Sequence, residues 1–96
     1  MPRAYNVAIA GATGAVGEEF RKLLEERPFP LASVRLLASP RSHGKKVRFR
    51  GESVTVEVMT TESFAGCDIA FFSAGASRSR EFAPAAVAAG AVVIDN

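Results

Sequence analysis

Three glycines lie three residues apart in IAGATGAVGEEF, which spans residues 9–20. They follow the short apolar run YNVAIA (5–10) and precede a segment whose apolar residues recur at helical spacing. Because glycine inside a helix costs about 0.5–1 kcal/mol relative to alanine, three of them at a helix start need a compensating role. A strand that turns through glycines into a helix is typical of a phosphate-binding turn, since the first helical amides lack partners and the helix dipole adds positive charge there.

Each glycine has an expected task in such a turn. Gly11 would make the tight turn, Gly14 would let a phosphate approach the backbone, and Gly17 would let the helix lie close to the first strand. The Thr13 hydroxyl could donate a further hydrogen bond. The spacing is G-x-x-G-x-x-G, not the commoner G-x-G-x-x-G. The alternative is that the glycines serve only close packing of helix on sheet.

The segment after the turn predicts a helix over residues 15–26. Its apolar side chains fall at i, i+4, i+7 and i+8, on one helical face, and charged residues fill the other face. Two prolines at 28 and 30 end it. The apolar positions are Val16, Phe20, Leu23 and Leu24.

The rest of the chain continues the alternation of strand and helix. Gly90 is expected at the C′ position of the second helix, and Pro84 in its first turn, or else at a kink. The order β-α-β-(ββ)-β-α-β predicts an α/β fold of one domain, residues 1–96, with a mostly parallel sheet and an added β-hairpin. The predicted elements are a strand at 33–39, a polar loop at 40–46, a hairpin over 47–58 turning at 50–53, a strand at 67–75, a helix at 77–90 and a strand at 91–96.

The end of the second strand, LLASPRSHGKK, indicates which dinucleotide would fit. NAD sites usually carry an acid there for the ribose 2′-hydroxyl, but residues 34–51 contain none. Ser39, Arg41 and Ser42 would instead bind a 2′-phosphate through charge-assisted hydrogen bonds. We therefore expect NADP as the cofactor. The alternative is an ordinary solvated basic loop.

The run FFSAG ends the next strand with small residues. In an open α/β sheet, ligands lie outside the carboxyl ends of the strands, so Ser73, Ala74 and Gly75 could let a cofactor pass close to the backbone. A plain strand-to-helix turn is the alternative. Cys67, at the opposite end of that strand, is expected to be a buried structural thiol, and His43 a solvated or phosphate-neighbouring residue.

Composition limits the partners. The formal net charge of +2 gives no reason to expect nucleic acid, and no apolar run approaches the ~20 residues of a membrane span. One cysteine and one histidine cannot build a metal site. We expect a reducing, cytoplasmic setting.

Three stretches together resemble the N-terminal NADP-binding part of bacterial aspartate-semialdehyde dehydrogenases. They are VAIAGATGAVGEEF, ASPRSHGK and DIAFFSAGASRSREFAPAAVAAGAVVIDN, and they span nearly the whole chain in the family's order. The resemblance implies a Rossmann-type NAD(P)-binding fold and a phosphorylating aldehyde dehydrogenase that interconverts aspartate 4-semialdehyde and aspartyl phosphate. His43 departs from the small residue usual at its place.

The resemblance also assigns roles along the chain. It places the pyrophosphate at the glycine turn, the 2′-phosphate at the basic loop and the nicotinamide half near the FFSAG turn, with no catalytic residue in this chain. It implies a homo-oligomeric parent, dimer or tetramer, whose catalytic and substrate-binding residues lie beyond residue 96, so that residues 1–96 would be an inactive cofactor domain. The cofactor-binding residues are Gly11, Thr13, Gly14, Ala15, Val16, Ser39, Arg41, Ser42, Ser73, Ala74, Gly75 and Asn96.

Other readings share parts of the pattern. N-acetyl-gamma-glutamyl-phosphate reductase has a similar glycine turn, but the SPRSHGK loop favours the first family. Short-chain reductases also begin GATG but need a Tyr and Lys pair, and Tyr5 is the only tyrosine. A non-catalytic nucleotide-binding module is a third alternative.

Overall fold

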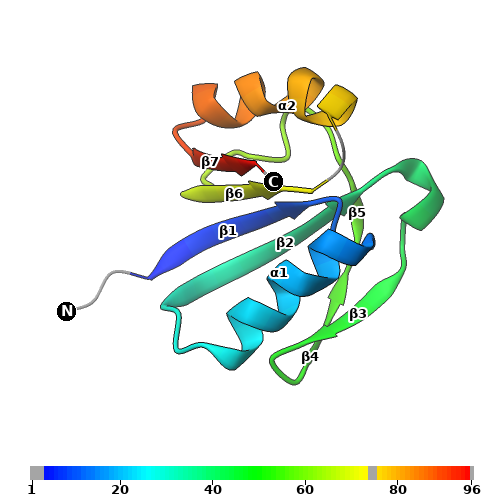
Figure 1. The fold of residues 1–96 in the computed structure, drawn as a ribbon, viewed down its shortest axis with the longest axis vertical. Helices are drawn as coiled ribbons and strands as arrows, with labels where there is room; N and C mark the ends of the chain where they lie inside the picture. The colour runs from blue at the N-terminus through cyan, green and yellow to red at the C-terminus, as the bar shows by residue number, and fades with distance from the viewer. Residues whose placement is uncertain (1–3, 74–75, 96) are drawn as a thin grey trace.

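The computed structural model describes residues 4–73 and 76–95, with the backbone alone at 76–78. Two helices, seven strands and one short 3-10 helix are formed in the described residues. Figure 1 shows how they are arranged. Their bounds are β1 (Tyr5–Ala10), α1 (Ala15–Glu26), β2 (Leu31–Ala38), η1 (Pro40–Ser42), β3 (Lys46–Phe49), β4 (Glu52–Thr55), β5 (Glu57–Val58), β6 (Ile69–Phe72), α2 (Ala76–Ala88) and β7 (Val92–Asp95).

Five strands form one parallel sheet in the order β5-β2-β1-β6-β7. From β1 the chain builds outward to β2 and β5 on one side, and later to β6 and β7 on the other. The strand order therefore reverses between β1 and β6. Ligands of open α/β sheets bind outside the carboxyl ends of the strands at such a switch point. The predicted Rossmann-type α/β fold is confirmed, and its switch point lies at the carboxyl ends of β1 and β6.

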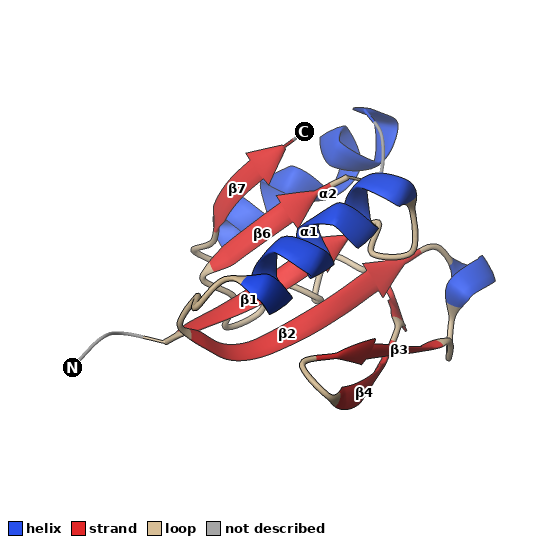
Figure 2. Cartoon of the chain, turned by 60° about the horizontal axis from the view of Figure 1, so that its bottom comes forward, coloured by secondary structure: helices blue, strands red, loops and turns tan. Residues whose placement is uncertain are grey.

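Helices cover both faces of the sheet, α1 on one side and α2 on the other (Figures 1 and 2). Successive residues of β1 alternate between two buried clusters: Val7 and Ile9 pack in the cluster that contains Leu24 of α1, while Ala8 and Ala10 pack in the cluster beneath α2. Burial on both faces explains why β1 is a continuous apolar run instead of an alternating one.

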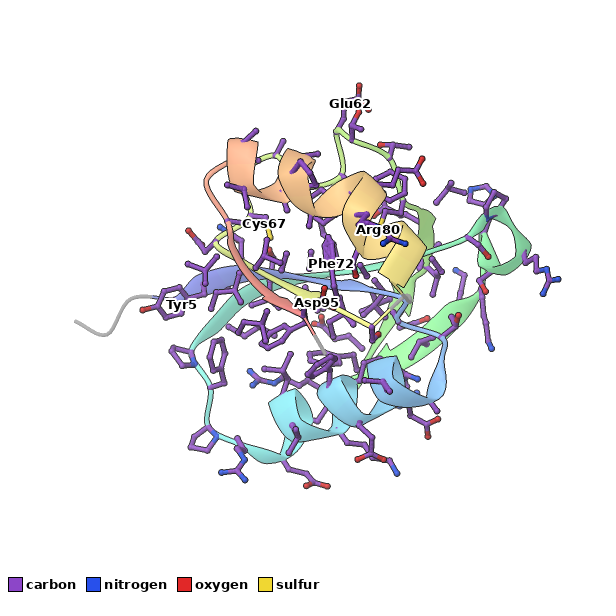
Figure 3. All side chains as sticks on the ribbon, turned by 45° about the horizontal axis from the view of Figure 1, so that its top comes forward. Tyr5, Glu62, Cys67, Phe72, Arg80 and Asp95 are labelled. Atoms are coloured by element: carbon purple, nitrogen blue, oxygen red, sulfur yellow. The ribbon has the colours of Figure 1, made fainter. Side chains whose placement is uncertain are left out.

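α2 lies over β6 and β7. Phe72 of β6 packs beneath it in one cluster with Phe82 and Ala86 (Figure 3). Ala89 is exposed and follows the last helical residue. Pro84 is the ninth residue of α2, so its expected place in the first turn is wrong.

The predicted C-terminal glycine of α2 is confirmed. Gly90 has a φ of 95°, its N–H donates to the Val87 carbonyl at 2.9 Å, and the Ala91 N–H donates to the Ala86 carbonyl at 3.0 Å. These two bonds form a Schellman motif, in which a left-handed residue satisfies the last carbonyls of a helix.

The hairpin forms as a separate two-stranded antiparallel sheet of β3 and β4. Its second strand is shorter than predicted. The chain leaves the hairpin at Val56, which is fully buried, and Glu57–Val58 then joins the main sheet in parallel with β2. The alternation of valines continues across this break, so the change of sheet leaves no mark on the sequence pattern.

The turn of the hairpin also caps α1. Arg50 has a φ of 49°, and its Nη2 donates to the carbonyls of Leu24 at 2.6 Å and Phe29 at 3.1 Å. Its backbone N–H donates to Glu25 Oε2 at 2.9 Å. A cation at the C-terminal end of a helix satisfies free carbonyls and complements the helix dipole.

Other bounds differ modestly from prediction. β2 begins at Leu31 because Leu31 pairs with Tyr5, which extends the strand at its start. A 3-10 turn, η1, stands where a loop was expected. β6 is limited to four residues, since its pairing with β1 begins at Ile69.

Candidate functional site

The glycine turn leaves β1 sharply and is tied to β2. Gly11 has a φ of 83°, the left-handed region that glycine adopts at little cost. The N–H groups of Gly11 and Ala12 both donate to the Leu37 carbonyl, at 2.8 and 3.1 Å. The predicted role of Gly11 in a tight turn is confirmed.

Gly17 lets α1 lie against that turn. A Cβ at this position would sit 2.8 Å from the Ala12 Cα and closer still to the Gly11 carbonyl oxygen. Real Cβ atoms essentially never approach backbone atoms so closely. The predicted close approach of helix and turn at Gly17 is confirmed.

Gly14 differs from Gly17 in having room around it. A Cβ here would meet only the Gly11 carbonyl oxygen, at an ordinary 3.6 Å, and its φ of −80° suits any residue. Gly14 is the N-cap of α1, no side chain caps the helix, and its own N–H donates to the Gly11 carbonyl at 3.1 Å. The space in front of the first helical turn is therefore open, which packing alone does not require.

The amides that open α1 have no acceptor within residues 4–73 and 76–95. The first helical bond is donated by Glu18 to the Gly14 carbonyl. Ala15 and Val16 are exposed, and their N–H groups precede that bond. Unpaired amides at a helix N-terminus form a ready anion site.

A polar pocket of about 340 Å³ lies at the carboxyl ends of β1, β2, β5 and β6. The pocket brings together five of the predicted site residues. Two others, Ala38 and Met59, were not expected from the sequence; Met59 follows the two-residue strand β5, whose length is too short to give a periodic signal. The lining residues are Gly11, Thr13, Gly14, Ala38, Ser39, Met59 and Ser73.

The basic loop reaches this pocket from the end of β2. The Ser42 Oγ of η1 lies 3.2 Å from the Thr13 Oγ1 of the glycine turn, within hydrogen-bond distance. Arg41, beside it, is exposed and makes no hydrogen bond or ion pair with any described residue. The glycine turn and the basic loop, 29 residues apart in sequence, are therefore neighbours in space. His43, at the end of the same turn, is exposed.

Ser73 follows β6 at the switch point and bonds to the end of β1 and to the glycine turn. Its N–H donates to the Ala10 carbonyl at 2.9 Å, and its Oγ lies 3.0 and 3.2 Å from the carbonyl oxygens of Ala10 and Gly11. The hydroxyl thus ties β6 to the glycine turn. Ala74, Gly75 and Asn96, predicted beside it, lie outside the described residues.

Cys67 lies at the opposite, amino end of β6. It is buried, and its Sγ contacts the carbonyls of Ile69 at 3.1 Å and Asn6 at 3.5 Å. Burial raises the pKa of this thiol, so it carries little thiolate at neutral pH and is a poor nucleophile. The predicted structural role is confirmed.

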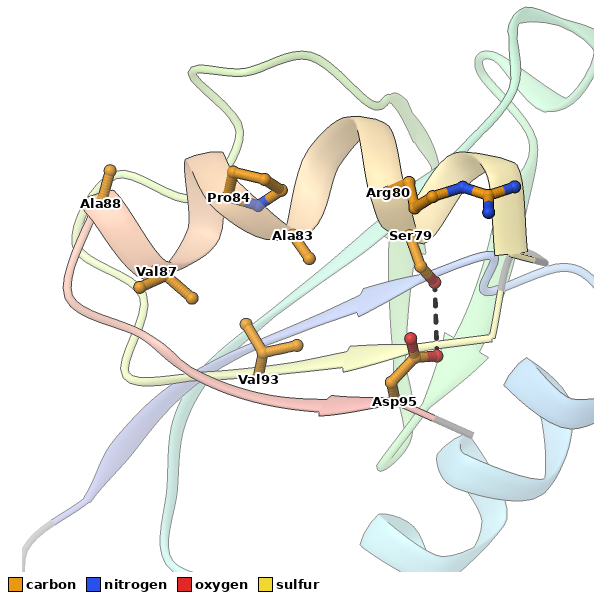
Figure 4. Close-up of a pocket in the computed structure, with 8 residues that line it drawn as sticks. All are labelled: Ser79, Arg80, Ala83, Pro84, Val87, Ala88, Val93 and Asp95. Carbon is orange, nitrogen blue, oxygen red and sulfur yellow. Dashed lines mark hydrogen bonds between the residues drawn. The ribbon is translucent and has the colours of Figure 1, made fainter.

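A larger hollow of about 780 Å³ lies between α2 and β7 (Figure 4). Its walls are mostly apolar, and a side-chain hydrogen bond joins Ser79 Oγ to Asp95 Oδ1 at 3.3 Å. No residue of the glycine turn lines this hollow. The smaller pocket is therefore the better candidate for a dinucleotide.

No group of three or more metal-ligating side chains gathers within residues 4–73 and 76–95. No helix in that part is both long and apolar enough to cross a membrane.

Comparisons with known proteins agree with this geometry. Residues 6–96 match the family model "Semialdehyde dehydrogenase, NAD binding domain". The aspartate-semialdehyde dehydrogenase of Legionella pneumophila is 55% identical over 96 residues, which are all of this chain and 28% of that protein. This chain thus spans less than a third of the length of the curated relatives it matches.

Solved structures agree. Aspartate semialdehyde dehydrogenase II of Vibrio cholerae, complexed with ASA, superposes with a TM-score of 0.93 at 50% identity over 98% of this chain and 31% of that one. The enzyme of Candida albicans, solved with NADP, gives a TM-score of 0.82 at 28% identity over 98% of this chain and 30% of that one. With the fold, the glycine turn and these matches in agreement, the chain belongs to the family of semialdehyde dehydrogenase NAD-binding domains.

Proposed function

We propose that this chain binds NADP as the cofactor domain of an aspartate-semialdehyde dehydrogenase. The observation that carries the proposal is the meeting of the glycine turn and the basic loop at the switch point, joined by the Thr13–Ser42 contact of 3.2 Å. One part offers amides that have no acceptor among the described residues, and the other carries the exposed guanidinium of Arg41, which has no partner among those residues, next in sequence to Ser42.

The residues present fit that group. The space in front of Gly14, which a Cβ would partly fill, suits a pyrophosphate that packs against Gly14 and accepts from the amides of Thr13, Ala15 and Val16. Ser39, Arg41 and Ser42 would hold the 2′-phosphate, and no carboxylate lies between residues 34 and 51 to repel it. The nicotinamide half would lie toward Ser73, Ala74, Gly75 and Asn96.

The reaction in the whole protein would interconvert L-aspartate 4-semialdehyde, phosphate and NADP with L-4-aspartyl phosphate and NADPH. The names of the relatives support this substrate over that of N-acetyl-gamma-glutamyl-phosphate reductase. When bound, the cofactor supplies a hydride acceptor. This chain's own residues bind and orient it.

We further propose a cytoplasmic, homo-oligomeric enzyme without nucleic-acid partners; its one buried free thiol is compatible with a reducing compartment.

We expect no turnover from the 96-residue chain by itself. Acyl transfer through a thioester needs an accessible thiolate, and the only cysteine, Cys67, is buried with a raised pKa at the far end of the sheet from the pocket. An assay with semialdehyde, NADP and phosphate tests this, and any rate above background would contradict it.

Titration calorimetry of the 96-residue chain with NADPH and with NADH tests the binding proposal. We expect NADPH to bind clearly more tightly. Equal affinity for the two cofactors would refute the role of the basic loop, and binding of neither would refute the cofactor site itself.

A further inference from the structure

Arg21 lies in the second turn of α1 and reaches back to the glycine turn. It follows Gly17 by four residues, so both lie on the helix face that meets the turn. Its side chain is partly buried, and its Nε donates to the Ala12 carbonyl oxygen at 3.1 Å. The close approach that Gly17 permits is what brings this carbonyl within reach of the guanidinium.

The bonded carbonyl belongs to the Ala12–Thr13 peptide group, whose N–H is that of Thr13. This N–H has no acceptor within residues 4–73 and 76–95. Ala12 is fully buried and its own N–H is held by Leu37, so the position of the peptide is fixed from both sides. A cationic donor on a carbonyl polarises the whole peptide group and makes its N–H a stronger donor.

We propose that Arg21 is a positioning residue for diphosphate binding, one that aims and polarises the Ala12–Thr13 peptide without touching the ligand. The inference rests on the proposed function, because the ligand of the Thr13 N–H is the pyrophosphate. It differs from the role of Arg41, which would act on the 2′-phosphate. Arg21 would therefore strengthen the binding of NADPH and of NADH equally.

Three variants of the 96-residue chain test the proposal. Arg21→Met keeps the length of the side chain and removes the donor. We expect it to weaken the binding of NADPH and of NADH by the same factor, about five- to tenfold. Arg21→Lys should recover most of the affinity, because the contact uses one N–H and not the guanidinium fork. The matched control is Lys22→Met, which removes an exposed cation next in sequence and should change either affinity less than about twofold.

Three affinity results would overturn the proposal: wild-type affinity in Arg21→Met, an equal loss in Lys22→Met, or a loss confined to NADPH. An Arg21→Lys variant as weak as Arg21→Met would overturn it too. Thermal unfolding of each variant checks that folding is retained.

The Thr13 amide resonance in the ligand-free chain separates this inference from the proposed function. We expect the ¹⁵N shift of Thr13 to move in Arg21→Met and to stay in Lys22→Met. If the wild-type chain binds neither cofactor, the proposed function fails, while a moved Thr13 resonance still supports the Arg21 contact. An unmoved resonance would refute the polarisation of the peptide whatever the cofactor does.

Discussion

β1 and β6 pair in parallel over four residues, and their two ends differ in how their polar groups are satisfied. At the amino end, the Asn6 N–H donates to Asp68 Oδ2 at 2.8 Å and the Asp68 N–H donates to the Asn6 carbonyl at 2.7 Å, with Cys67 packed beside them. At the carboxyl end, the amides of Thr13, Ala15 and Val16 have no acceptor within the described residues.

The difference teaches where to look for function in such a sheet. The amino end holds a carboxylate, an amide and a thiol, residue types that often carry chemistry. Yet Asp68 bonds to Asn6, and the Cys67 thiol bonds to backbone carbonyls, so these groups have partners within the fold. The carboxyl end holds mostly glycine, alanine and serine, yet it leaves donors open. In the described residues, unsatisfied backbone groups and not reactive side chains mark the end at which we propose that the cofactor binds.

The largest expected effect comes from placing a methyl group at Gly17. Gly17→Ala forces the Cβ against backbone atoms of Gly11 and Ala12, so we expect a loss of about 2–3 kcal/mol in the free energy of unfolding together with loss of NADPH binding. Urea unfolding and calorimetry measure the two.

Gly14→Ala is the matched variant. Its Cβ has room, at 3.6 Å from the Gly11 carbonyl oxygen, so stability should fall by less than about 1 kcal/mol while NADPH binding weakens. Similar stability losses in the two variants would contradict the separation of packing from binding at this turn.

Arg41 distinguishes the two proposed phosphate sites at the carboxyl ends of the strands. Arg41→Ala should weaken NADPH by about 1.5–3 kcal/mol, as for a hydrogen bond to a charged group, and leave NADH nearly unchanged. Arg48→Ala, which removes an exposed arginine from β3, should change neither. Equal losses for both cofactors in Arg41→Ala would count against its assigned role.

Asp68 tests the amino end of the β1–β6 pair, where its carboxylate bonds to Asn6. Asp68→Asn weakens the acceptor of the Asn6 N–H, so we expect about 1 kcal/mol less stability with unchanged NADPH affinity. Glu81→Gln, at an exposed carboxylate of α2, serves as the control. A marked loss of affinity in Asp68→Asn would show that the two ends are coupled.

The smallest effect concerns Cys67. Its folded pKa is raised by burial, so the folded chain keeps this proton at pH values where the unfolded chain, with a thiol pKa of about 8.5, releases it. Below that range both states hold the proton, and within it the free energy of unfolding falls as pH rises. Between about pH 7 and 9.5, the free energy of unfolding should decline less steeply in Cys67→Ala than in the wild-type chain. Parallel curves of this free energy against pH would refute a contribution from the Cys67 thiol.

Periodicity alone predicted much of the fold. α1 has the predicted bounds because an amphipathic face, a glycine start and two prolines all act locally. Gly90 at C′ was also predictable because the signal for a helix end lies in the local sequence. β5 was not, because a two-residue strand is defined by its partner β2 and not by its own pattern.

The site was predictable where it depends on backbone geometry. Gly11 and Gly17 have the predicted roles because each follows from a φ angle or a close contact. Met59 was missed because its place depends on the unpredicted β5. Arg21 was placed among the charged residues of the solvent face, although its spacing of four from Gly17 puts it on the helix face that meets the turn.

Two arginines hold the opposite ends of α1. Arg21 fastens its start to the glycine turn, and Arg50, from the hairpin, grips its last carbonyls. The helix between them is a rod about 18 Å long, at 1.5 Å per residue. The hairpin therefore supports the C-terminal end of the helix, opposite the end whose amides face the pocket.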